Sequence, residues 1–195
     1  MGKIVKRNRL SILEKFENKI SFFSNNIFLS LLIIGIIGLS IRILFLNIEI
    51  PMNSDNFRYF NVAINLMTGY SSEGSILAND GWPYFLSLFF SITPSNNFMD
   101  YMALQRFLTI GISVLTIIPI YFLSKQFVGK KFAVLSSAIF IFEPRIAQNS
   151  LFGITEPLYI MAITISLALI FNKKYYVQYI SFAILSFAIL IRSEG

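Results

Sequence analysis

The sequence contains neither cysteine nor histidine. Without these residues the chain can form no disulfide, no thiolate or imidazole metal site, no thiol nucleophile and no imidazole acid–base catalyst. Any catalysis must therefore rest on carboxylates, arginines, hydroxyls or a hard cation bound by oxygen. These two absences exclude disulfide-stapled secreted modules, zinc enzymes and haem proteins.

Charged residues are also scarce. They make up 13% of the 195 residues, whereas 55% are hydrophobic and the mean hydropathy is +0.68. A soluble domain carries about 25% charged residues, so this chain has too few charges to cover a water-facing surface. The 21 Phe and 9 Tyr residues exclude intrinsic disorder, because disordered chains lack aromatic content. The composition therefore predicts an integral membrane protein.

Five apolar runs approach the length of about 20 residues that a membrane-spanning helix needs. A sixth run, Gly81–Ile92, is shorter and suits an interfacial or re-entrant helix. The expected fold class is all-α integral membrane, with about five transmembrane helices and an outer interfacial-helix loop between the first and second. The five predicted spans are Ile27–Leu46, Ala103–Leu123, Phe132–Ala147, Pro157–Phe171 and Tyr176–Ile191.

Every lysine falls in one of three segments: the amino-terminal tail, Lys125–Lys131 and Lys173–Lys174. The positive-inside rule places these segments in the cytoplasm. We therefore expect a multi-pass protein of the cell membrane with a cytoplasmic N-terminus and an outer loop over residues 47–102. The pI of about 9.6 then reflects topology and predicts no nucleic-acid partner.

The amino-terminal region is expected to differ from the rest of the chain. Residues 1–26 predict a cytoplasmic amphipathic tail, either a helix on the inner membrane surface or a frayed segment. The first apolar run lacks a small-x-small cleavage site after it and therefore predicts a permanent anchor. Residues 27–195 are expected to form the transmembrane domain.

The basic residues outside the lysine segments are all arginines. Arginine binds phosphate or carboxylate through a rigid, bidentate fork, while lysine is a mobile point charge. Each arginine alone could snorkel to the lipid headgroups. As a set, they favour binding an anion at the outer interface, with a lipid phosphate as the obvious candidate. They are Arg42, Arg58, Arg106, Arg145 and Arg192.

An acidic residue opens an expected amphipathic helix in the first outer loop. Residues 53–55 are all good N-cap formers, apolar residues follow at helical spacing, and Gly69 suits the C′ position. Such a helix would lie in the membrane interface and hold Asp55 at its first turn, with Arg58 three residues on. Asp55 is then either a helix cap or a functional carboxylate. The apolar residues of this face are Phe57, Phe60, Ile64 and Met67.

Two further acids lie near the outer ends of predicted spans. Glu156, within Thr155-Glu156-Pro157, either caps the fourth span or acts at the interface. Glu143 ends the preceding span, where it either pairs with Arg145, terminates the helix or contributes to substrate binding. The sequence thus predicts carboxylates and arginines together at the outer interface.

The order of these features resembles the amino-terminal half of the glycosyltransferase C superfamily, which uses polyprenyl-phosphate-linked sugars. The resemblance is to its protein mannosyltransferase and aminoarabinose transferase members, and it covers residues 40–195. The residues that carry it are Arg42, Ser54-Asp55, Tyr59, Gly69-Tyr70, Gly81-Trp82-Pro83-Tyr84, Arg106, Tyr121-Phe122-Leu123, Gly129, Pro144, Thr155-Glu156-Pro157-Leu158-Tyr159 and Arg192-Ser193-Glu194-Gly195.

The resemblance implies transfer of a sugar, with inversion, from a dolichyl- or undecaprenyl-type phosphate to a protein, lipid or glycan acceptor. Asp55 would be the catalytic base and Glu156 a second catalytic carboxylate. No cofactor is required, although a divalent cation such as Mg²⁺ or Mn²⁺ is compatible. Asn56 stands where many relatives have a second acid, which weakens the case for a metal. The residues implied in substrate binding are Arg42, Arg58, Tyr59, Arg106, Glu143 and Arg192.

The superfamily has more spans than this chain, so the sequence is expected to be a truncated reading frame that is inactive alone. A second class of function stays open: a non-catalytic membrane subunit or transporter fragment whose arginines bind anionic membrane lipid. Against transport, no predicted span carries a charge near its midplane, and no broken-helix repeat is present.

Overall fold

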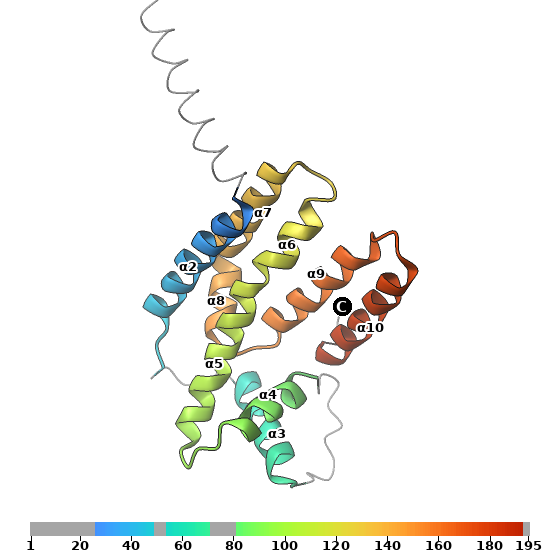
Figure 1. Cartoon of the computed structure of the whole chain (residues 1–195). Coiled ribbons are helices and arrows are strands. Elements are labelled where there is room, and N and C mark those ends of the chain that lie inside the picture. Colours follow the sequence, from blue (N-terminus) through green and yellow to red (C-terminus); the bar gives the residue numbers. More distant parts are fainter. Residues whose placement is uncertain (1–25, 49–53, 71–80, 193–195) are drawn as a thin grey trace, which may run out of the picture.

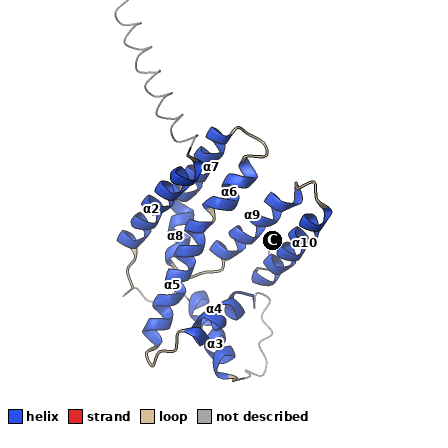
Figure 2. Ribbon diagram, in the orientation of Figure 1, coloured by secondary structure: helices blue, strands red, loops and turns tan. Residues whose placement is uncertain are grey.

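The structure is a computed structural model that describes residues 26–48, 54–70 and 81–192. Within these residues the chain is all-helical, with no strand, as the composition predicts (Figure 1, Figure 2). The predicted tail over residues 1–26 lies outside the described part except for its last residue. The helices are α2 (Ile27–Phe45), α3 (Ser54–Thr68), α4 (Gly81–Ile92), α5 (Phe98–Leu115), α6 (Ile117–Ser124), α7 (Lys130–Phe142), α8 (Pro144–Leu151), α9 (Glu156–Ile170) and α10 (Tyr175–Ile191).

Five helical segments alternate in direction along one axis of the molecule (Figure 1). They are α2, α5 with α6, α7 with α8, α9, and α10. The start of α2, the α6–α7 turn with Lys125 and Lys130, and the α9–α10 turn with Lys173 and Lys174 share one end, here called the lysine end. Helices α3 and α4 lie at the opposite end, here called the arginine end.

Two helices are long and apolar enough to cross a membrane, judged by length and composition. They are Ile27–Phe45, and Phe98–Ser124, in which α5 continues into α6. Three shorter apolar helices, α4, α9 and α10, are also present among the described residues. The structure thus gives two of the five predicted spans a helix of spanning length, and the other three are shorter.

The predicted span Phe132–Ala147 is wrong as a single helix. Helix α7 ends at Phe142 and α8 begins at Pro144, with Glu143 extended between them at φ −64° and ψ 120°. Proline has no N–H to donate to the carbonyl of Phe140, and its ring disfavours a helical conformation at the preceding residue. The helix is therefore interrupted at Glu143.

Helix α2 has its small and polar side chains inside and its large apolar side chains outside. Ser30, Gly35, Gly38 and Arg42 are its buried residues. A Cβ atom on Gly38 would overlap the buried side chain of Ile141 in α7, so glycine permits this close contact. Soluble proteins show the opposite arrangement, whereas small residues at helix contacts are common within membranes. The exposed apolar side chains include Phe28, Leu32, Ile36, Ile37, Ile43, Leu44 and Phe45.

Most of the apolar face of α3 packs on protein, whereas the sequence predicted that this face lies on the membrane; Phe57 of the same face is 46% exposed. Phe60 is buried and contacts Phe90 of α4, with ring centroids 5.9 Å apart. Ile64 and Met67 pack on the same cluster. The helix ends as predicted: Gly69 has a φ of 73°, and the amide of the next residue donates to the carbonyl of Asn65.

Candidate functional site

Arg42 joins four helices at the arginine end of the molecule. The residue is 1% exposed. Nε donates to Ser150 Oγ at 3.0 Å, and Nη2 donates to Ser113 Oγ at 3.2 Å. Nη1 donates to the carbonyls of Gly38 and Ile141, both at 3.1 Å. Arg42, a residue of α2, is thus hydrogen-bonded to residues of α5, α7 and α8.

The charge of Arg42 is balanced by helix ends. Among the described residues no carboxylate lies within ion-pair distance of it. However, Ile141 belongs to the last turn of α7, whose carbonyls have no partner within the helix, and Arg42 itself lies in the last turn of α2. The carboxyl end of a helix carries partial negative charge and favours a cation. These carbonyls hold the guanidinium in place.

A cavity of about 520 Å³ lies beside this cluster, here called the arginine cavity. Arg42 and Arg106 both line it, and Arg106 donates to the carbonyl of Asn47 at 2.5 Å. The rest of its wall is mainly apolar. The cavity therefore combines guanidinium groups with a surface suited to hydrocarbon. Its other lining residues are Ile41, Phe45, Asn47, Ile141, Phe142, Pro144, Ala147, Gln148, Leu151 and Phe152.

Asp55 lies in the first turn of α3, one residue after the helix begins at Ser54. Its side chain is exposed and makes no hydrogen bond or ion pair with any described residue. Arg58 is also exposed, and no ion pair joins it to Asp55. Tyr59 is half-buried against the aromatic cluster between α3 and α4. Among the described residues, the carboxylate of Asp55 thus accepts no hydrogen bond from a backbone amide.

Two buried carboxamides hold the start of α3 against the turn between α8 and α9. Asn56 is 0% exposed, and its Nδ2 donates to the carbonyl of Phe152 at 2.6 Å. Gln105 of α5 is also 0% exposed, and its Nε2 donates to the carbonyl of Gly153 at 2.6 Å. Phe152 lines the arginine cavity. Asn56, the residue that follows Asp55, is therefore bonded to the backbone of a residue of the cavity wall.

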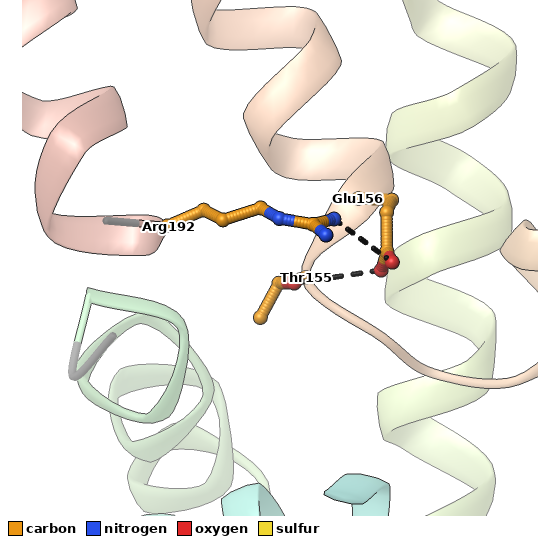
Figure 3. Close-up of polar contacts among 3 residues, drawn as sticks. All are labelled: Thr155, Glu156 and Arg192. Atoms are coloured by element: carbon orange, nitrogen blue, oxygen red, sulfur yellow. Dashed lines mark hydrogen bonds and ion pairs between the residues drawn. The ribbon is translucent and has the colours of Figure 1, made fainter. Parts of the chain in front are cut away.

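Glu156 and Arg192 form an ion pair between the start of α9 and the end of α10 (Figure 3). Arg192 Nη1 lies 3.0 Å from Glu156 Oε1, and Thr155 Oγ1 lies 3.4 Å from Glu156 Oε2. The side chain of Glu156 is 27% exposed and that of Arg192 is 33% exposed. A predicted catalytic carboxylate and a predicted substrate-binding arginine thus contact each other. Such partly exposed pairs contribute little to stability.

Glu143 caps a helix. Its Oε2 accepts a hydrogen bond of 2.7 Å from the amide of Ile146 in the first turn of α8. Of the alternatives the sequence left open, termination of the preceding helix is the one the geometry matches. Arg145 is exposed and forms no ion pair with Glu143. We therefore assign Glu143 to the framework of the site.

Several polar side chains that assemble this region were not predicted from the sequence. Gln105, Thr109 and Ser113 follow one another at four-residue spacing on one face of α5, and all are buried. Thr109 Oγ1 donates to the carbonyl of Ser150 at 2.8 Å. A polar stripe at helical spacing within an apolar helix marks a helix contact. That spacing was visible in the sequence and could have identified these residues.

No group of three or more acidic side chains within the described residues lies close enough to hold a metal ion. No protein-family model, curated protein or solved structure matches the chain. The candidate site therefore rests on three features of the arginine end: the arginine cavity, the exposed carboxylate of Asp55 on α3, and the ion pair at the start of α9.

Proposed function

We propose that the protein is part of a membrane glycosyltransferase that moves a sugar from a polyprenyl-phosphate carrier to an acceptor at the arginine end. The observation that carries this proposal is the arginine cavity. A polyprenyl phosphate has an anionic head and a hydrocarbon tail, and the cavity offers Arg42 and Arg106 beside apolar walls. Because Arg42 already donates four hydrogen bonds to protein, its guanidinium would attract the phosphate mainly through its positive charge.

The chemistry assigned to the site follows from the charges involved. Cleavage of the bond between sugar and phosphate leaves negative charge on the phosphate, which nearby arginines stabilise. The acceptor hydroxyl must lose a proton as it attacks the sugar carbon, and Asp55 is the carboxylate available to take it. In this proposal Glu156, paired with Arg192, orders the start of α9 at the edge of the site.

The proposal includes five membrane crossings, by α2, α5–α6, α7–α8, α9 and α10. Their alternating direction supports it, as does the gathering of Lys125, Lys130, Lys173 and Lys174 at one end. Large exposed apolar side chains on α2 and α10 would contact lipid. Helices α9 and α10 are short for about 30 Å of hydrocarbon, which local thinning of the bilayer or flanking residues accommodate.

Cysteine labelling tests this topology against a clean background, because the natural chain contains no cysteine. Tyr70 and Gly129 are both exposed, and they lie at the arginine and lysine ends respectively. With the lysine end in the cytoplasm, Tyr70→Cys should react with an impermeant maleimide added to intact cells, and Gly129→Cys should react only after lysis. The opposite pattern would reverse the orientation and move the site to the cytoplasmic face.

A transfer assay tests the activity itself. Membranes that contain the full-length protein should move labelled sugar from a dolichyl- or undecaprenyl-phosphate donor to an endogenous acceptor, and membranes from cells that lack it should not. Equal labelling in both membranes, across several sugar donors, would contradict the enzymatic proposal. It would favour the alternative of a non-catalytic membrane subunit that binds anionic lipid.

A further inference from the structure

Two grooves lie on either side of α6, and they share one wall. The first, here called the α2 groove, lies between α2 and α6 and has a volume of about 650 Å³. The second, here called the α9 groove, lies between α6 and α9 and has a volume of about 660 Å³. Both are lined mainly by apolar side chains. The residues common to the two are Leu115, Ile118, Phe122 and Lys125.

The shared residues form a ridge with a charge at one end. Their spacing of three, four and three places them on one face of the α5–α6 helix. From Leu115 to Lys125 the helix rises about 15 Å, at about 1.5 Å per residue. That length is about half of the roughly 30 Å hydrocarbon thickness of a bilayer. Each groove therefore matches the depth of one leaflet, and Lys125 lies where a headgroup would be.

The charges around Lys125 are all of one sign among the described residues. Lys130 and Lys131 begin α7, and Lys173 and Lys174 lie in the α9–α10 turn at the same end. The described acidic residues are on elements of the arginine end: Asp55, Asp100, Glu143 and Glu156. An anion is therefore attracted to this end, and an apolar chain attached to that anion would fit the grooves.

A buried hydroxyl in the α2 groove also favours an anion with an attached apolar chain as the ligand. Tyr121 lines this groove and is 2% exposed, and its hydroxyl has no hydrogen-bond partner among the described residues. Lys125 Nζ lies 5.9 Å from the centre of its ring. A buried hydroxyl without a hydrogen-bond partner costs free energy, and a phosphate or ester oxygen would accept a hydrogen bond from it.

We propose that this site binds a two-chain anionic phospholipid, with its phosphate at Lys125 and Tyr121 and one acyl chain in each groove. The occupant is a lipid because an inorganic anion would leave both apolar grooves unfilled. The site is separate from the arginine cavity, which lies at the other end of the molecule. The inference therefore does not depend on the proposed sugar transfer.

The experiment is native mass spectrometry of the whole 195-residue chain in detergent micelles, titrated with phosphatidylglycerol, phosphatidylcholine or inorganic phosphate. We expect phosphatidylglycerol to bind more tightly than phosphatidylcholine, and inorganic phosphate not to compete with it at millimolar concentration. Equal affinity for the two lipids, or competition by inorganic phosphate, would overturn the proposal.

Matched variants separate the site from general surface charge. Lys125→Gln should weaken phosphatidylglycerol binding about fivefold, because one lysine near an anionic membrane contributes about that much. Lys174→Gln is the control: Lys174 also lies over a tyrosine ring, at 5.7 Å from that of Tyr176, but lines neither groove. It should weaken binding less than twofold. Equal losses in the two variants would show that no specific site exists.

Two further variants test the hydroxyl and the grooves while Lys125 remains. Tyr121→Phe removes only the hydroxyl and should weaken binding about threefold, as expected for loss of one hydrogen bond. Ile118→Trp adds bulk to the wall that both grooves share. Because Ile118 is 44% exposed, this variant should fold normally and still lose lipid binding. Wild-type affinity in both, with unchanged thermal unfolding, would contradict the proposed pose.

Discussion

Asp55→Asn is expected to reduce sugar transfer by about 10²–10⁴-fold in the full-length protein, because loss of a general base has that effect. The variant keeps the size of the side chain and removes only its charge. Asp55 is exposed and makes no hydrogen bond or ion pair with any described residue, so folding depends little on it. Loss of a favourable charge at a helix start costs about 0.3–1 kcal/mol. Transfer rate at matched expression is the measurement.

Asp100→Asn is the matched control for this prediction. Asp100 is also an exposed acid in the first turn of a helix at the arginine end, and it accepts a hydrogen bond of 2.6 Å from Ser95. It should leave the rate within about threefold of wild type, since a surface change of this kind alters stability by about 0.5 kcal/mol or less. Glu156→Gln should lower turnover less than Asp55→Asn. If Asp55→Asn keeps more than about a tenth of the wild-type rate, Asp55 is not the base.

Arg42→Met should lower the free energy of unfolding by about 2–5 kcal/mol. The change removes four buried hydrogen bonds, three of them to other helices, and such interhelical bonds are worth about 0.6–1.7 kcal/mol each in membrane proteins. Part of this loss is offset because methionine needs no desolvation of a charge. The measurement is equilibrium unfolding in mixed micelles without any polyprenyl lipid, so a contribution from bound carrier is excluded.

Arg145→Met serves as the control, because Arg145 is an exposed arginine at the same end of the molecule. It should change the free energy of unfolding by about 0.5 kcal/mol or less. Equal unfolding free energies for the two variants would mean that Arg42 acts only as a ligand for substrate. The free energy of unfolding of Arg42→Lys should lie between those of the two methionine variants. An ammonium has fewer donors than the guanidinium fork and cannot bond all four acceptors.

Local signals determined much of the helical framework. Helical spacing of apolar residues predicted α3, and a short apolar run predicted α4 with the bounds Gly81–Ile92 that it has. Gly69 adopts the positive φ expected of a residue that follows a helix. The two lysine segments that the structure describes, Lys125–Lys131 and Lys173–Lys174, also lie together at one end, as their order along alternating helices requires. These features depend on residues close in the sequence, and the sequence therefore predicts them.

The division of the third predicted span shows where a local signal was present but outweighed. The run from Phe132 to Ala147 is apolar enough to suggest one helix, yet Pro144 removes a backbone donor and the helix is interrupted at Glu143. Hydropathy averaged over the run hides this single residue. The apolar run predicted a single membrane-spanning helix, whereas the missing N–H and the ring of one proline divided it into two shorter helices.

The contacts of the candidate site were decided by tertiary structure. Arg42 bonds Ser150, which is 108 residues away, and Asn56 bonds the carbonyl of Phe152, which is 96 residues away. Glu156 and Arg192 are 36 residues apart. The sequence identified Arg42, Asp55 and Glu156 as chemically significant, since charges are rare in an apolar chain. Which of them would be buried, paired or exposed depended on how the helices pack, because that packing alone brings distant donors and acceptors within hydrogen-bond distance.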